Sequence, residues 1–149
     1  MSLFNLKNKS FLITGSSRGI GKSIALNAAI EGAKVIISSR KIDACNKTAD
    51  EINELIGSEV AFPIQANIAD ESQLINLVEE TNKILGKIDV LICNAATNPF
   101  MGSMADIPSD AFDKIMNNNI KANHLLTNLV TPQMIDRKDG VIIIISSVG

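Results

Sequence analysis

The sequence predicts an α/β fold in which one parallel sheet is covered by helices on both faces. Short apolar, β-branched runs alternate with longer segments of helical periodicity, which is typical of consecutive strand–helix units. The runs are almost continuously apolar, as expected of strands that are covered on both sides. The chain has 149 residues, 46% of them hydrophobic, and this suits one domain with a sizeable core.

Five of these runs are predicted to be strands, and four segments between them are predicted to be helices. We expect the strands at residues 11–14, 34–38, 60–65, 90–93 and 141–146. We expect the helices at about 19–31, 42–55, 71–85 and 110–131. Because crossovers between parallel strands are right-handed, these units favour a doubly wound sheet with the strand order 3-2-1-4-5.

Local signals support the ends of the helices. Gly32 is a typical stop signal for the first helix, and Asp70 is a good N-cap for the third. Pro132 is expected to close the fourth and longest helix. That helix carries six residues at alternating spacings of four and three, which predict one buried stripe: Phe112, Met116, Asn119, Asn123, Leu126 and Val130.

Composition argues against several classes of protein. The formal net charge is −2, so we expect no nucleic-acid partner and no charged membrane-binding surface. The longest apolar run, residues 141–145, is far shorter than a membrane span. Cys45 and Cys93 match no metal or redox spacing, and we interpret them as ordinary small apolar residues of a reduced, cytoplasmic protein without a metal site.

A glycine-rich loop follows the first strand and opens the first helix. It reads Thr-Gly-Ser-Ser-Arg-Gly-Ile-Gly and ends at Gly21, with the site residues Gly15, Ser17, Arg18, Gly19, Ile20 and Gly21. The first glycine allows a tight turn, the second a close approach to phosphate, and the third close packing of the helix. Free N–H groups and the helix dipole then face an anion. The alternative is a Gly/Ser surface turn, but the strand-to-helix setting favours a dinucleotide pyrophosphate.

These residues resemble the signature of the short-chain dehydrogenase/reductase family, Thr-Gly-x-x-x-Gly-x-Gly. The segment Asn94-Ala95-Ala96, after the fourth strand, is similar to the family's Asn-Asn-Ala-Gly segment, although Cys93 and Ala96 depart from it. The resemblance implies a Rossmann-like, single NAD(P)-binding domain over residues 1–149. Asn94, Ala95 and Ala96 are then expected at the cofactor.

The stretch after the second strand favours NADP(H) over NAD(H). NAD-binding folds carry an acidic residue there that contacts the ribose hydroxyls, but this chain has Ser39 followed by Arg40. Arg18 in the glycine loop could converge with Arg40 on a 2′-phosphate, as in NADP-preferring members of the family. The alternative is that both arginines are solvated surface charges. Asn67, with Ile68, stands where the family usually has an aspartate that contacts adenine; a loop asparagine can also be a simple turn residue.

Part of a catalytic apparatus is expected from the same resemblance. Asn119 is similar to the family's active-site asparagine, whose amide helps to hold a water in a proton relay; alternatively it is a buried asparagine satisfied by backbone. Ser147 is similar to the serine that polarises a substrate carbonyl, although a serine there could simply end a strand. The family also needs a tyrosine and a lysine in a Tyr-x-x-x-Lys motif, and this sequence contains no tyrosine.

A fifth strand of bulky apolar residues would be an exposed sheet edge, so we interpret the chain as a fragment whose later strands and helices are missing, unless another chain covers that edge. Three functions follow as alternatives. Completed by a C-terminal part, it would be the cofactor-binding portion of an NADP-dependent carbonyl reductase or alcohol dehydrogenase acting on a small molecule. By itself it would be an inactive NADP-binding remnant. The third is an oligomerisation module built on the fourth helix, and we expect a homo-oligomer. Short stretches resemble the carbonyl and retinal reductase branch, which does not fix the substrate.

Overall fold

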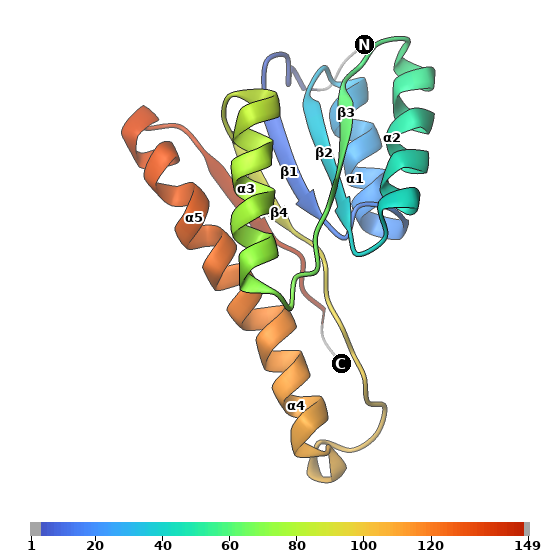
Figure 1. Ribbon diagram of the computed structural model, residues 1–149, viewed down its shortest axis with the longest axis vertical. Coiled ribbons are helices and arrows are strands. Elements are labelled where there is room, and N and C mark those ends of the chain that lie inside the picture. The colour runs from blue at the N-terminus through green and yellow to red at the C-terminus, as the bar shows by residue number, and fades with distance from the viewer. Residues whose placement is uncertain (1–3, 148–149) are drawn as a thin grey trace.

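The computed structural model describes residues 4–147, which form a parallel sheet of five strands in the order β3-β2-β1-β4-β5 (Figure 1). This confirms the predicted order. All four neighbouring pairs are parallel. The strands are β1 (Ser10–Thr14), β2 (Lys34–Ser39), β3 (Ala61–Gln65), β4 (Val90–Cys93) and β5 (Val141–Ile144). The last ends two residues earlier than the sequence predicts, and the other ends agree within one residue.

Helices cover both faces of the sheet (Figure 1). One face is covered by α1 (Gly19–Ile30) and α2 (Ile42–Ile56). The other is covered by α3 (Glu71–Leu85) and by a long helical segment. That segment consists of α4 (Ser109–Ile115), a π-helical turn (Met116–Lys121) and α5 (Ala122–Arg137), and it is preceded by a short 3₁₀ helix (Met104–Asp106).

Alternate residues of the strands build two separate cores. In β1, Ile13 packs in the cluster that includes Ala25 of α1 and Cys45 of α2. Its neighbour Leu12 packs in the opposite cluster, with residues such as Leu126 of α5. Because side chains alternate across a strand, a strand buried on both faces must be apolar at every position, and this explains the continuous apolar runs.

The cap predicted for the third helix is present. The Asp70 carboxylate accepts hydrogen bonds from the backbone N–H groups of Ser72 and Gln73, at 2.9 and 3.3 Å. It thereby satisfies two N–H groups of the first turn of α3 that have no acceptor inside the helix. Gly32, the predicted stop of the first helix, has a φ of +98° and follows the C-cap of α1.

The prediction that Pro132 closes the fourth helix is wrong, because α5 continues to Arg137. Proline removes one backbone donor, but it does not stop a helix whose last turn is held by tertiary contacts. Here the Gln133 side chain accepts from the backbone N–H of Ile88 at 2.9 Å. Arg137 donates to the Ile88 carbonyl at 2.8 Å, and Met134 is buried.

The buried stripe of that helix is confirmed only in its second half. Asn123, Leu126 and Val130 are buried, whereas Phe112 and Met116 are 43% and 42% exposed. Figure 1 shows the reason: α4 extends beyond the carboxyl end of the sheet, so its apolar face has no sheet to pack against. At the edge of the sheet, β5 has mostly exposed apolar side chains, as expected from the sequence.

Candidate functional site

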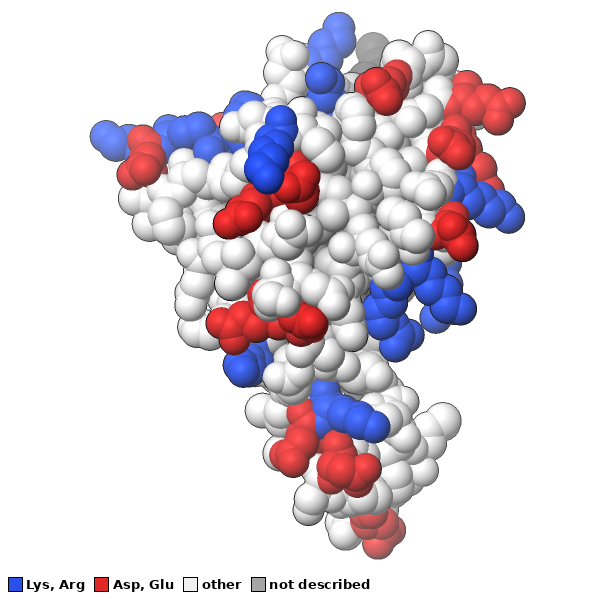
Figure 2. Space-filling view, viewed as in Figure 1, with Lys and Arg blue, Asp and Glu red and all other residues white. Residues whose placement is uncertain are grey.

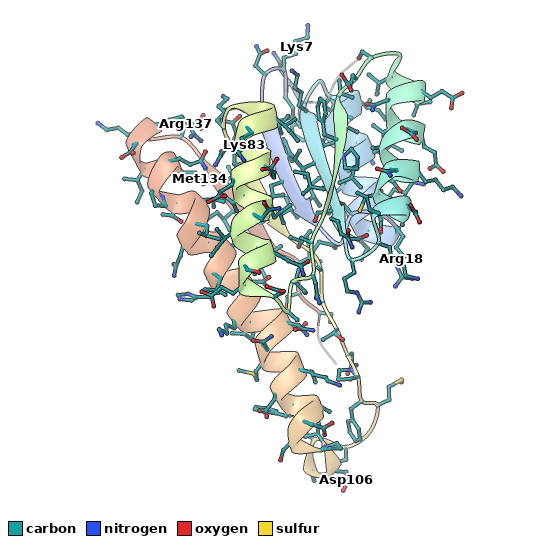
Figure 3. All side chains as sticks on the ribbon, in the orientation of Figure 1. Lys7, Arg18, Lys83, Asp106, Met134 and Arg137 are labelled. Atoms are coloured by element: carbon teal, nitrogen blue, oxygen red, sulfur yellow. The ribbon has the colours of Figure 1, made fainter. Side chains whose placement is uncertain are left out.

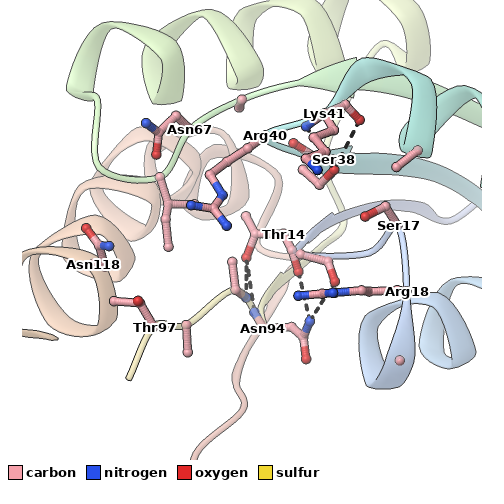
Figure 4. A pocket seen from close by; sticks show the side chains of 18 of the residues that line it. Thr14, Ser17, Arg18, Ser38, Arg40, Lys41, Asn67, Asn94, Thr97 and Asn118 are labelled. Carbon is pink, nitrogen blue, oxygen red and sulfur yellow. Dashed lines mark hydrogen bonds between the residues drawn. The ribbon is translucent and has the colours of Figure 1, made fainter. Parts of the chain in front are cut away.

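A cavity of about 640 Å³ lies at the carboxyl ends of the parallel strands (Figure 4). It lies beside the central strand β1, with β2 on one side and β4 on the other. The direction in which successive strands are added to the sheet reverses here, because β2 and β3 lie on one side of β1 and β4 and β5 on the other. Doubly wound sheets bind ligands at this crevice. Its walls come from the glycine loop, the turn after β2, the segments that follow β3 and β4, and the π-helical turn.

The structure brings together the residues that the sequence proposes for cofactor binding. Those that line the cavity are Gly15, Ser17, Arg18, Gly19, Ile20, Ser39, Arg40, Asn67, Ile68, Asn94, Ala95 and Ala96. Gly21 is the exception, since it is buried beneath the loop. A Cβ atom on Gly21 would lie 2.5 Å from the Gly15 carbonyl oxygen, so its role is close packing of α1.

The backbone of the glycine loop is suited to binding an anion. Gly15 and Gly19 have φ values of +63° and +58°, a conformation that favours glycine. A Cβ on Gly19 would meet no heavy atom within 4 Å, so the backbone at this position borders open space. The first N–H groups of α1 have no acceptor inside the helix, and the N-cap residue Arg18 supplies none from its side chain. The loop therefore offers donors and a positive helix end to a phosphate.

Buried hydroxyl groups fix the shape of this loop. The Ser16 hydroxyl donates to the Ile13 carbonyl oxygen at 2.7 Å and accepts from the backbone N–H of Ser38 at 2.9 Å. Thr48 of α2 donates to the Ser17 carbonyl oxygen at 2.9 Å. These bonds tie the loop to β2 and to α2.

Positive charge gathers at one side of the cavity. Its lining contains Arg18, Arg40 and Lys41, and among the described residues that line it there is no Asp or Glu. Figure 4 shows Arg18 and Arg40 approaching the cavity from two different segments of the chain. Figure 3 labels Arg18 on the right of the molecule, below α2, and Figure 2 shows Lys and Arg side chains gathered on that side. This charge distribution favours an anionic ligand.

Two of the asparagines that line the cavity are already engaged with backbone. Asn94 donates from its amide to the carbonyl oxygens of Thr14 and Gly15, both at 3.1 Å, so it joins the end of β4 to the glycine loop. The Asn67 side-chain oxygen accepts from the N–H of Ala69 at 3.1 Å, as in a turn. The Asn67 amide nitrogen remains available to a ligand, because no bond to another described residue engages it.

Asn119 holds a wall of the cavity rather than lining it. Its amide oxygen accepts from the N–H of Thr97 at 2.8 Å, and its amide nitrogen donates to the Thr97 carbonyl at 2.9 Å. Thr97 lines the cavity. Both ends of the amide are thus paired with backbone, which is the arrangement that the sequence left open as an alternative to holding water.

Ser147 is exposed beyond the end of β5 and is not among the residues that line the cavity. The structure therefore does not place the two proposed catalytic residues in one site.

Sequence reasoning missed several lining residues: Thr14, Ser38, Lys41, Ala44, Ala66, Thr97 and Asn118. Thr14 and Ser38 could have been found from the rule that ligands bind at the carboxyl ends of parallel strands. Asn118 lies in the π-helical turn, and such turns often mark functional sites. No periodicity in the sequence predicts that turn.

No group of three or more His, Cys, Asp or Glu side chains is arranged to bind a metal in residues 4–147. In the same range, no helix combines the length and apolar character needed to cross a membrane.

Comparison with known proteins agrees with the family resemblance of the glycine loop. A family model described as short chain dehydrogenase matches residues 9–149. Dehydrogenase/reductase SDR family member 4 from Bos taurus is 38% identical over 144 residues, which are 97% of this chain and 51% of the relative. Tropinone reductase-like 3 from Erythroxylum coca is 36% identical over 145 residues, 95% of this chain and 54% of the relative. The chain thus spans about half the length of these curated relatives.

Solved structures share the fold. One is a 7α-hydroxysteroid dehydrogenase complexed with NADH and 7-oxo glycochenodeoxycholic acid, with a TM-score of 0.88 and 35% identity over 96% of this chain and 55% of that one. Another is a metagenomic short-chain oxidoreductase in complex with NADP, with a TM-score of 0.87 and 28% identity over 97% of this chain and 64% of that one. Proteins of this fold therefore include both an NADH complex and an NADP complex.

Proposed function

Since this chain belongs to the short-chain dehydrogenase family, we propose that it is the cofactor-binding portion of an NADP-dependent oxidoreductase that interconverts a carbonyl and an alcohol. One observation carries the choice of cofactor: Arg18 and Arg40 line the same cavity as the glycine loop, with Ser39 in place of an acid. A 2′-phosphate on the adenosine ribose supplies the anion that two guanidinium groups bind well.

The residues of this chain would hold the dinucleotide along its length. The backbone at Gly19 and the first turn of α1 receive the pyrophosphate, and Arg18 and Arg40 receive the 2′-phosphate. The amide nitrogen of Asn67, which no bond to another described residue engages, would be available to donate to the adenine. A nicotinamide cofactor held by these residues would supply hydride-transfer chemistry to a carbonyl or alcohol substrate.

Cofactor titration tests this assignment. We expect NADPH to bind the purified protein at least tenfold more tightly than NADH, measured by nicotinamide fluorescence or calorimetry, because a charge-assisted hydrogen bond contributes about 1.5–3 kcal/mol. Arg40→Ala should lower the affinity for NADPH and leave that for NADH almost unchanged. Equal or tighter binding of NADH to the unaltered protein would contradict the proposal.

We assign Asn119 and Ser147 to the reaction on the basis of the family resemblance. Asn119 acts as a positioning residue, since its amide fixes Thr97 at the cavity wall. Ser147 polarises the substrate carbonyl by donating its hydroxyl proton in a hydrogen bond. The chain has no tyrosine to deliver a proton, so the 149 residues by themselves should bind cofactor without turning over ketones, aldehydes or alcohols. Turnover by this chain alone would show that the reaction does not require a tyrosine.

A homo-oligomer is favoured by the exposed apolar face of the helical segment. Phe112 of α4 and Met116 and Ile120 of the π-helical turn are 43%, 42% and 57% exposed. Burial of these side chains against a second copy of the chain would remove them from water. We expect Ile120→Asp to lower the sedimentation coefficient of the protein to that of a monomer while its circular dichroism spectrum stays that of the folded chain. An unaltered sedimentation coefficient would exclude this face as the interface.

A further inference from the structure

We propose that Gln65 is a positioning residue that holds Arg40 in place for the 2′-phosphate and so strengthens the preference for NADP(H). The proposal rests on the proposed function, because it concerns the same phosphate site. Gln65 itself is not among the residues that line the cavity. It must therefore act through the backbone that it contacts.

Gln65 contacts Arg40 directly. The Gln65 side-chain amide donates to the Arg40 carbonyl oxygen at 2.9 Å. The sheet register explains the contact: Gln65 is the last residue of β3 and lies opposite Ser39, the last residue of β2. The side chain of one strand end thus reaches the first residue after the neighbouring strand.

The turn between β2 and α2 has few other restraints at Arg40. The Ser39 hydroxyl accepts from the N–H of Lys41 at 3.4 Å and donates to the Lys41 carbonyl at 3.3 Å, both long hydrogen bonds. The backbone N–H of Ala66 donates to the Ser39 carbonyl at 3.0 Å. Ser39 and Lys41 are therefore tied to each other, and Ser39 is also tied to the residue that follows β3. Gln65 supplies a shorter bond to Arg40, the residue between them.

This restraint matters because a guanidinium group binds phosphate directionally. Its N–H groups form a rigid planar fork, and a bidentate contact requires that the fork face two phosphate oxygens. A backbone held in one conformation limits the rotamers and positions that Arg40 can sample, which lowers the entropy lost when the phosphate binds. NAD(H) has no 2′-phosphate, so its binding gains nothing from this order.

The experiment compares Gln65→Met, which keeps the length of the side chain but removes the donor, with the unaltered protein. We expect NADPH to bind about two- to tenfold more weakly, the range for loss of one partly exposed hydrogen bond. The affinity for NADH should stay within about twofold of the original value, since the contact acts only through the phosphate ligand. Asn76→Ala, which removes an exposed amide on α3 outside the cavity, serves as the matched control and should change neither affinity.

A double-mutant cycle separates positioning of Arg40 from a general effect on the fold. In an Arg40→Ala background, Gln65→Met should weaken NADPH binding no further. The inference is overturned if Gln65→Met leaves NADPH affinity unchanged, weakens NADH and NADPH equally, or weakens NADPH further when Arg40 is absent. If Arg40→Ala itself does not change the ratio of the two affinities, the 2′-phosphate assignment fails first, and the inference fails with it.

Discussion

The hydroxyl of Thr14 and the backbone of Asn94 join β1 to the segment that follows β4. The Thr14 side-chain oxygen accepts from the N–H groups of Asn94 and Ala95, both at 3.1 Å. Asn94 returns two bonds from its amide, to the carbonyl oxygens of Thr14 and Gly15. The glycine loop and the opposite wall of the cavity are thus built as one unit across the centre of the sheet.

Removal of this hydroxyl should weaken both the fold and the cavity. Thr14→Val keeps the shape of a side chain that is 1% exposed but leaves two N–H groups without their acceptor. We expect the free energy of unfolding to fall by about 1–3 kcal/mol, measured by urea denaturation, because unsatisfied donors in a part-buried site are costly. Thr14→Ser retains the oxygen and should recover most of this loss. A Val variant as stable as the Ser variant would show that these bonds contribute little.

Gly19 should be required for cofactor binding more than for folding. Gly19→Ala places a Cβ in the open space that borders the loop, where no protein atom lies within 4 Å. Its φ of +58° costs an L-residue about 1–2 kcal/mol of stability. We expect in addition a loss of NADPH binding of at least tenfold, since the methyl group would occupy the space that the phosphates approach.

Gly57 provides a matched control for this substitution. It has a φ of +74° and no heavy atom within 4 Å of an added Cβ, but it caps the end of α2 and does not line the cavity. Gly57→Ala should therefore lower stability to a similar extent without changing NADPH affinity. Similar NADPH affinities for the Gly19 and Gly57 variants would show that the phosphates do not approach Gly19.

The Cys93 thiol should not react in the folded protein. Burial raises its pKa to about 11, so at pH 8 very little of it is thiolate, and the side chain is 1% exposed. Cys45 is completely buried. We expect no release of thionitrobenzoate when the native protein is mixed with Ellman's reagent at pH 8, and labelling of both thiols in guanidinium chloride. Fast labelling of the native protein would contradict the packing at β4.

The stabilisation from Asp70 should depend on pH. Hydrogen bonds from Ser72 and Gln73 hold the pKa of this carboxyl below its usual value of 3.8. A lowered folded-state pKa means that the contribution is complete above the unfolded-state pKa and disappears as the pH falls through the folded-state value. Asp70→Ala should lower the urea midpoint at pH 7, and the difference from the unaltered protein should shrink below pH 4.

Asp50→Ala serves as the reference for this measurement, because Asp50 is an exposed carboxyl on α2 and caps no helix. It should change the urea midpoint little at any pH. A difference for Asp70→Ala that is the same at pH 3 and pH 7 would mean that the carboxylate charge does not take part in the cap.

The sequence alone determines the strand order and the place of the binding site. The continuous apolar runs require strands that are covered on both faces, and right-handed crossovers leave few ways to connect them. The carboxyl ends of such strands meet at one edge of the sheet. Gly15 and Arg18 follow β1, Arg40 follows β2 and Asn94 follows β4. The sequence therefore predicts that these residues lie together, and they do line one cavity.

Only the tertiary structure decides how the long helical segment behaves. Pro132 stays within α5 because contacts from Gln133 and Arg137 to Ile88 hold the turn that follows it. Phe112 is exposed because α4 extends past the sheet. A sequence pattern reports that a helix has an apolar face, but it does not report whether another element reaches that face.

The same limit applies to the contacts that position the site. The bond from Gln65 to Arg40 and the two bonds between Asn119 and Thr97 join residues from separate segments of the chain. No spacing in the sequence encodes these pairs, since they depend on the register of β2 with β3 and on the π-helical turn. Local sequence patterns thus predict many of the residues that line the cavity. Packing between helices and strands determines which hydrogen bonds hold those residues in place.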